Sequence, residues 1–103
     1  MAIAEVTVVP IGTESTSLSN YVAKCQEVLE KEDKIEYQLT PMGTIIEGDL
    51  NELLIVIRKL HEVPFTKGAE RVTTNIKIDD RRDKEASTKQ KLDSVAQAMQ
   101  ENN

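Results

Sequence analysis

The stretch that decides the fold is Ile35–Asp49, IEYQLTPMGTIIEGD. Up to Thr40, apolar and polar residues alternate with the two-residue period of a half-buried strand. Pro41–Gly43 interrupts that pattern, and Thr44–Ile46 is rich in β-branched residues, which favour a return strand. The stretch therefore predicts a β-hairpin whose three-residue loop, Pro41–Gly43, ends on a glycine in the left-handed conformation.

A helix is predicted directly after the hairpin, over Leu50–Val63. Asp49 can cap its first turn, and Glu52 three residues later completes a pair that resembles a capping box. Ile55 points nearly opposite to the apolar face and Val56 flanks it, so we expect the helix to have a second packing partner. The apolar face consists of Leu50, Leu53, Leu54, Ile57, Leu60 and His61.

The N-terminal part of the chain predicts a strand, Ala2–Pro10, and a helix, Leu18–Glu32. Proline cannot donate to a ladder of hydrogen bonds, so we expect the strand to end at residue 10. Thr16 or Ser17 can cap the helix. Cys25 lies on its apolar stripe, together with Leu18, Tyr21, Val22, Val28 and Leu29, and we interpret it as a small core residue.

The C-terminal part predicts a loop over Pro64–Glu70, a strand over Arg71–Asp79 and a tail helix over about 84–100. Val72, Thr74, Ile76 and Ile78 share one face of this strand. The tail helix has one narrow apolar stripe, so we expect it to dock on another surface or to fray. The stripe is formed by Leu92, Val95, Ala96 and Met99.

The resulting order is β-α-β-β-α-β followed by a helix, which predicts an α+β, ferredoxin-like sandwich in a single domain, 1–103, with its core over about 2–80. Both helices should cover the same face of the sheet. The other face, which we call the open face, is mixed and can be covered by a second copy or hold a polar ligand. It carries Ile3, Glu5, Thr7, Val9, Gln38, Thr40, Asn75 and Lys77.

Composition restricts the possible partners. The 103 residues carry a net charge of −5, which argues against nucleic acid and anionic membranes as partners. No apolar run approaches the length of a membrane span, and no signal-like segment precedes Ile3, so we expect a cytoplasmic protein. The single cysteine excludes an intramolecular disulfide framework.

No catalytic or metal-binding motif is found in the sequence. His61 is the only histidine and has no cysteine near it in the sequence, so we expect it to be a packed side chain and expect no metal site. The residues alone indicate a small oligomeric binding module, without a cofactor and without catalysis.

Leu39–Gly48, LTPMGTIIEG, resembles the signature of the small thiamine-binding protein family. Ser19–Val22, His61–Glu62 and Arg71–Arg81 match the same family in order, so the resemblance covers nearly the whole chain. Asp33-Lys34 departs from the glycine usual there and puts only the helix C-cap in doubt. The resemblance implies a ferredoxin-like fold, assembly as a homotetramer, and binding of thiamine or its hydroxymethylpyrimidine moiety without known catalysis.

This resemblance and the open face together give the expected ligand-binding residues. The Thr44 hydroxyl should hydrogen-bond the ligand, and a carboxylate, Glu47 or Glu5, should face its positive charge. Thr44 and Glu47 are three residues apart, so in a regular strand they point to opposite faces. If Thr44 shares the open face with Thr40, Glu47 lies on the helix side as a possible strand-end cap. The full set is Met42, Gly43, Thr44, Glu47, Glu5, Ser19 and Asn75.

Two other functions stay open at this point. The chain could be a scaffold or regulatory protein that acts through a partner protein, with exposed Ile55 in the interface. It could also be an enzyme of thiamine metabolism. The sequence does not distinguish transport, storage and sensing as the role of a binding protein.

Overall fold

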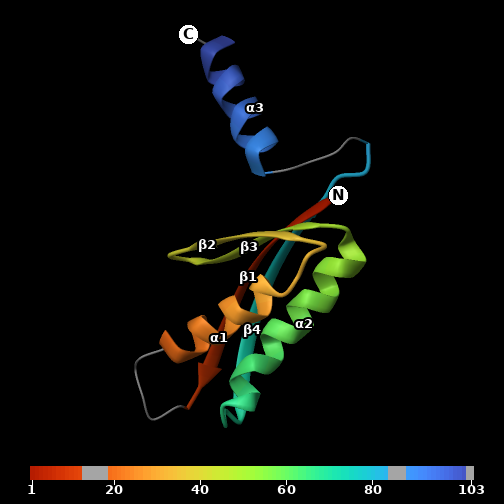
Figure 1. The fold of residues 1–103 in the computed structure, drawn as a ribbon. Coiled ribbons are helices and arrows are strands. Elements are labelled where there is room, and N and C mark those ends of the chain that lie inside the picture. The colour runs from red at the N-terminus through yellow and green to blue at the C-terminus, as the bar shows by residue number, and fades with distance from the viewer. Residues whose placement is uncertain (13–18, 84–87, 102–103) are drawn as a thin grey trace.

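The computed structural model describes residues 1–12, 19–83 and 88–101. It contains one antiparallel sheet with the strand order β2-β3-β1-β4, and three helices (Figure 1). The α+β, ferredoxin-like prediction with an additional C-terminal helix is confirmed. The elements are β1 (Ala2–Ile11), α1 (Ser19–Glu30), β2 (Glu36–Thr40), β3 (Gly43–Gly48), α2 (Leu50–Thr66), β4 (Arg71–Asp80) and α3 (Thr88–Glu101).

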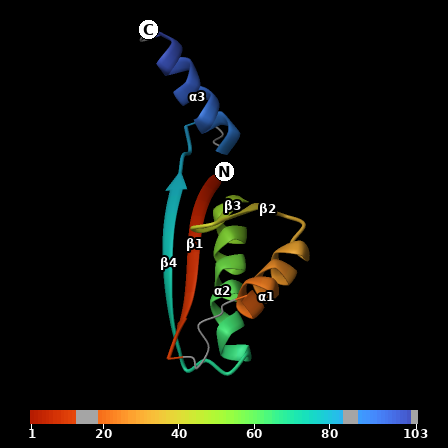
Figure 2. The same ribbon diagram turned by 90° about the vertical axis from the view of Figure 1, so that its left-hand side faces the viewer.

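Helices α1 and α2 both lie on one face of the sheet, and no helix of the described residues packs across the opposite face (Figures 1 and 2). The register of β1 with its neighbours assigns the faces, because directly paired residues point to the same side. Glu5 pairs with Lys77 and with Ile45, and Thr7 pairs with Asn75. The predicted membership of the open face is therefore confirmed.

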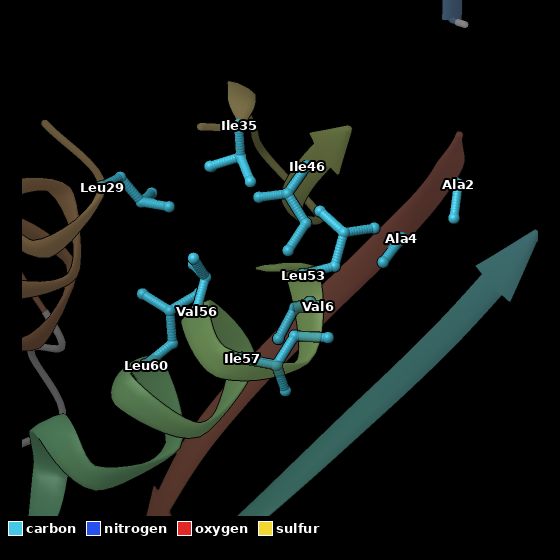
Figure 3. Close-up of a cluster of buried hydrophobic side chains, with 10 residues drawn as sticks. All are labelled: Ala2, Ala4, Val6, Leu29, Ile35, Ile46, Leu53, Val56, Ile57 and Leu60. Atoms are coloured by element: carbon cyan, nitrogen blue, oxygen red, sulfur yellow. The ribbon is translucent and has the colours of Figure 1, made fainter. Parts of the chain in front are cut away.

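The core fills the space between α2 and the sheet (Figure 3). Alternate residues of β1, namely Ala2, Ala4 and Val6, point into it and are almost completely buried. The small alanine side chains let the helix approach the sheet closely, and larger side chains from α1, α2 and β3 fill the remaining volume. The larger members include Leu29, Ile46, Leu53, Val56 and Leu60.

Strand β1 has two different halves. It pairs with β4 along its entire length, Ala2–Ile11, but pairs with β3 only over Ala2–Val6. Pro10 lies inside the strand, where the predicted boundary is one residue short, and it is tolerated because β1 has a single partner there. The sheet therefore has a notch beside Thr7–Ile11, beyond the tip of the β2–β3 hairpin.

The hairpin loop has two residues, Pro41 and Met42, rather than the three that we predicted. Thr40 pairs with Gly43 across the turn. The Thr40 hydroxyl accepts hydrogen bonds from the backbone N–H groups of Met42 and Gly43, at 3.2 and 3.1 Å, and donates to the Gly43 carbonyl at 2.8 Å. This side chain closes the loop in the manner of a Ser/Thr turn.

Gly43 is not in the left-handed turn conformation that we predicted. Its φ of +158° is close to that of an extended strand. The position needs glycine because of a close approach: a Cβ atom there would lie 2.9 Å from Thr7 Oγ1 and 3.0 Å from the Val6 carbonyl oxygen. The hairpin tip is therefore in close contact with the middle of β1.

Helix α2 is longer than predicted and turns a different face to the core. It continues through Pro64 to Thr66, because a proline so near the end costs few helical hydrogen bonds. Val56 is fully buried, whereas Leu54, which we had placed on the core face, is 46% exposed. The predicted cap of the helix is confirmed, since Asp49 Oδ2 accepts a bond from the Asn51 N–H at 3.1 Å.

Helix α1 contributes to the core mainly through Leu29, with Cys25 and Val28 partly buried beside it. Val22, which we had placed on its buried stripe, is mostly exposed. Leu18 and the predicted caps Thr16 and Ser17 lie outside the described residues.

Helix α3 stands away from the sandwich, beyond the N-terminal end of β1 (Figures 1 and 2). An ion pair between Lys91 and Asp79 joins its first half to the end of β4. Its apolar stripe of Leu92, Val95 and Met99 is exposed. Among the described residues, no helix is long and apolar enough to cross a membrane.

The close approach at Gly43 predicts the effect of a substitution. Gly43→Val should destabilise the protein by about 1–3 kcal/mol, because the new side chain overlaps the backbone of β1. Thermal or urea unfolding followed by circular dichroism measures this change. Met42→Val in the exposed loop is the matched control and should stay within about 0.5 kcal/mol of the wild type. An unchanged midpoint for the Gly43 variant would contradict the packing described.

Candidate functional site

The notch beside β1 opens into a cavity of about 270 Å³. Its walls come from four elements: the second half of β1, the β2–β3 hairpin tip, α1 and the end of α2. The volume lies just below the range of about 300–1,000 Å³ that is typical of small-molecule sites, so it suits a ligand the size of one substituted ring. The lining residues are Val6–Pro10, Tyr21, Val22, Cys25, Leu39–Thr44, Leu60 and Pro64.

No charged side chain lines this cavity within the described residues. Valine, leucine and proline side chains form most of the wall, and Tyr21 supplies the only aromatic ring. A cavity with these walls favours a neutral ligand, because no charged group among the described lining residues compensates a buried charge. Polar recognition must come from hydroxyl and backbone groups.

Two kinds of polar group are available in the cavity. Thr44 contributes a hydroxyl that has no hydrogen-bond partner among the described residues, unlike Thr40, which closes the hairpin loop. The edge of β1 over Thr7–Val9 has no strand beside it, so part of its backbone N–H and C=O groups face the notch. The Thr7 hydroxyl donates to the Met42 carbonyl at 3.3 Å and connects the two walls.

Cys25 faces the cavity from α1 as a half-buried thiol. Burial raises the pKa of this thiol above its ordinary value. The neutral form is therefore favoured even more than in a solvated cysteine, and the cavity stays uncharged at neutral pH.

The structure divides the predicted ligand residues between two places. Met42, Gly43 and Thr44 line the cavity. Ser19 is the first residue of α1, and its side chain lies outside what the structure describes. Glu5, Glu47 and Asn75 lie on the open face, on the other side of the sheet from Thr44. Thr44 and Glu47 point to opposite sides of the sheet, as expected. However, Thr44 lies on the helix side and Glu47 on the open face, which is the reverse of the arrangement that we considered.

Several lining residues were not among the sequence predictions. Tyr21 and Cys25 were assigned to the core because they follow the apolar spacing of α1. Leu60 was assigned to the apolar core face of its predicted helix, and Pro64 lies beyond the end that was predicted for that helix. The β1 edge contributes through its backbone, for which no residue type is diagnostic. The predicted length of β1, and the predicted start of β3 at the hairpin loop, are the sequence signals that could have indicated it.

A second cavity, of about 280 Å³, lies on the open face beside α3. In contrast to the first, it has charged walls, including Glu5, which pairs with Lys77 in the sheet, and the Lys91–Asp79 ion pair. Its apolar walls are Ile3, Ile45 and Leu92.

His61 packs against β4, away from both cavities. Its Nδ1 atom lies 2.6 Å from Thr74 Oγ1, and its ring meets the Phe65 ring edge-on at 5.6 Å. In the described part of the chain, no group of three or more His, Cys, Asp or Glu side chains is placed to hold a metal ion.

The structure is that of a small α+β protein with a cavity whose described walls are uncharged. Residues 4–96 match the family model described as thiamine-binding protein, and the chain belongs to this family. The UPF0045 protein YqgV of Bacillus subtilis is 56% identical over 103 residues, covering 97% of this chain and 99% of its own.

Solved structures show the same fold. The hypothetical protein MJ1052 of Methanocaldococcus jannaschii superimposes with a TM-score of 0.80 at 37% identity, covering 92% of this chain and 95% of its own. A domain of unknown function from Bacillus cereus gives a TM-score of 0.78 at 28% identity, covering 88% and 86% of the two chains.

The raised pKa of Cys25 predicts slow alkylation. At pH 7–8 its thiolate fraction is smaller than that of a solvated thiol, so iodoacetamide should label it more slowly, and the rate should continue to rise above pH 9. Mass spectrometry of timed samples gives the rate. Met42→Cys in a Cys25→Ser background is the exposed control. Equal rates for the two thiols would contradict the burial of Cys25.

Proposed function

We propose that this protein binds the hydroxymethylpyrimidine half of thiamine, or free hydroxymethylpyrimidine, in the notch cavity and performs no reaction on it. The observation that carries the proposal is the combination of uncharged walls with an unpaired strand edge in a member of the thiamine-binding family. We place the protein in the cytoplasm, and its role in the transport, storage or sensing of thiamine.

The pyrimidine ring matches the polar groups of the cavity. An aminopyrimidine is neutral and flat, and it carries an amino donor beside ring-nitrogen acceptors. A strand edge offers backbone acceptors and donors at regular spacing, so Thr7–Val9 can bond such a ring along one side. The Thr44 hydroxyl can donate or accept on another side, and Tyr21 and Met42 provide flat or adaptable apolar contact.

The thiazolium half carries a positive charge, and no carboxylate among the described residues lines the cavity to compensate it. We therefore place the thiazolium of bound thiamine at the mouth of the cavity, in solvent. Glu5 and Glu47 cannot reach it within one chain, because they lie on the open face. The charge of the ligand should then contribute little to its affinity.

Assembly into a homo-oligomer, a dimer or a tetramer, is part of the proposal. The open face carries Ile3, Val9 and Ile45, which are all partly buried, and in the described part of the chain only the first half of α3 lies beside it. A second copy packed on this face would bury these side chains together with the charged cavity beside α3. Light scattering at micromolar concentration should give a multiple of the chain mass, and a monomer mass would contradict this part of the proposal.

Isothermal titration calorimetry tests ligand binding. Hydroxymethylpyrimidine and thiamine should bind with similar affinity, because the pyrimidine supplies most of the contacts. Thr44→Val keeps the side-chain shape and should weaken both by about 1–2 kcal/mol, roughly 5–30-fold, since one polar group of the bound ring loses its partner. Thr73→Val on the exposed open face is the matched control and should leave the affinity unchanged.

Substitution of the two carboxylates tests whether the thiazolium lies in solvent or faces a carboxylate. Glu47→Gln and Glu5→Gln should leave thiamine affinity and its salt dependence unchanged if the thiazolium lies in solvent. A clear loss of affinity would instead show that a carboxylate faces the cation, as the sequence first indicated. Absence of binding heat for either ligand at millimolar concentration would contradict the proposal as a whole.

A role through a partner protein is the alternative, favoured by one observation. Ile55 is 49% exposed on the outer side of α2, in a shallow groove that it shares with Val28 of α1 and Val63. If the protein acts as a scaffold, Ile55→Ser should abolish capture of that partner in a pull-down and leave calorimetry unchanged. The same variant with full capture would contradict the alternative.

A further inference from the structure

Helices α1 and α2 lie side by side in one layer and form a groove on their outer side, away from the sheet (Figures 1 and 2). Its volume of about 530 Å³ is about twice that of the notch cavity, and the two cavities share no lining residue. A molecule in this groove therefore leaves the notch free. We call it the helix groove, and its lining residues are Lys24, Val28, Ile55, Arg58, Lys59, Glu62, Val63 and Thr66.

The floor of the helix groove is apolar. Val28 of α1 is half-buried, Val63 of α2 is buried, and Ile55 is 49% exposed. Ile55 and Val63 belong to the same helix, and their separation in sequence corresponds to about 12 Å along its axis. An occupant that covers this floor must therefore present apolar groups over about two helical turns.

The rim of the helix groove is mostly basic. It has three cations, Lys24, Arg58 and Lys59, and one carboxylate, Glu62, whereas the whole chain has a net charge of −5. Charges further away than about 8 Å are largely screened at physiological ionic strength, so an occupant interacts mainly with this rim. The local charge favours an acidic occupant, although the protein as a whole is acidic.

Arg58 is the cation of the rim that is available to an occupant. Lys59 is already paired with Glu32 at 2.5 Å, and Lys24 is paired with Glu27 at 3.1 Å. Arg58 is exposed and makes no hydrogen bond or ion pair with another residue that the structure describes. An arginine can bind a carboxylate through two parallel hydrogen bonds, and arginine is enriched among the residues that dominate binding at protein interfaces.

The shape of the helix groove selects a helix as its occupant. The walls are two helices whose backbone N–H and C=O groups are bonded within each helix, so they offer no edge with which a strand could pair. Side chains of a third helix can pack between the ridges of α1 and α2, which is the helix-in-groove mode of recognition. Nucleic acid is disfavoured, because binding of its phosphates needs a larger cluster of cations.

We propose that the helix groove binds an acidic amphipathic helix of a partner protein. Apolar side chains of this helix cover Ile55, Val28 and Val63, and a carboxylate beside them bonds the guanidinium of Arg58. The proposal rests on the partner-protein function considered above and names the chemical class of that partner. It does not depend on the ligand of the notch, because that cavity has other walls.

Two synthetic peptides of about 18 residues, or about five helical turns, test the charge preference. Both carry the same leucines at i, i+4, i+7 and i+11 on an alanine background, and the flanking positions are glutamate in one and lysine in the other. Fluorescence anisotropy should show binding of the glutamate peptide, with an affinity that falls as salt is added. Equal binding of the two peptides, or no binding of the glutamate peptide at millimolar protein, would overturn the proposal.

Substitutions test whether the peptide occupies the helix groove. Arg58→Glu should weaken the glutamate peptide by about 3–10-fold and strengthen the lysine peptide, since one ion pair is replaced by a repulsion. Ile55→Ser should weaken the glutamate peptide about tenfold through loss of apolar contact. Arg71→Glu is the matched control, because it makes the same charge change at an exposed position of β4. Equal effects of the two arginine substitutions would overturn the proposal.

Two further measurements separate the alternatives. Calorimetry with hydroxymethylpyrimidine should give the same result for wild type, Arg58→Glu and Ile55→Ser, so failure of the notch proposal and failure of the groove proposal are seen independently. Light scattering should give an unchanged mass for Ile55→Ser, and a lower mass would assign the groove to contact between copies of the chain and overturn the proposal. Displacement of the glutamate peptide by a duplex oligonucleotide or by anionic lipid vesicles would also overturn it.

Discussion

The structure depends on the unequal pairing of the central strand. Over Ala2–Val6, β1 has a hydrogen-bonded neighbour on each side and contributes three small side chains to the core. From Thr7 onward it keeps only β4. The first half therefore anchors the sandwich, and the second half leaves backbone groups free beside a cavity. Stability and the candidate site derive from two adjacent segments of one strand.

Much of the fold could be predicted from side-chain period alone. Alternation assigned the open face, and the Asp49 cap located the start of α2, because both effects are local. The predicted end of α2 was wrong because we took Pro64 as the residue that terminates the helix. A buried proline in the last turn removes few helical hydrogen bonds and packs well. Leu54 is exposed although we placed it on the core face, and Val56, which we placed at the flank of that face, is buried. The reason is that α1 lies on a side of α2 that the sequence could not specify.

The site was harder to predict, and the hairpin loop shows why. A three-residue loop would pair Thr40 with Thr44 and set both on the open face. The actual two-residue loop pairs Thr40 with Gly43, and this shift of one residue turns every side chain of β3 to the other side of the sheet. Thr44 therefore enters the cavity and Glu47 leaves for the open face. No propensity distinguishes these cases, since the closing interaction is a single threonine hydroxyl.

The pairing of β1 with β4 also affects the order of events during synthesis. The ladder pairs Ala2 with Asp80, so the pairing of β1 cannot be completed until β4, the last strand of the sheet, has been synthesised. At about 5–20 residues per second, the intervening residues take several seconds to emerge. During that interval β3 of the hairpin is the strand available to pair with β1. Until β4 has been synthesised, the future central strand is therefore an edge strand, and its pairing with β4 closes the longest loop in the sheet.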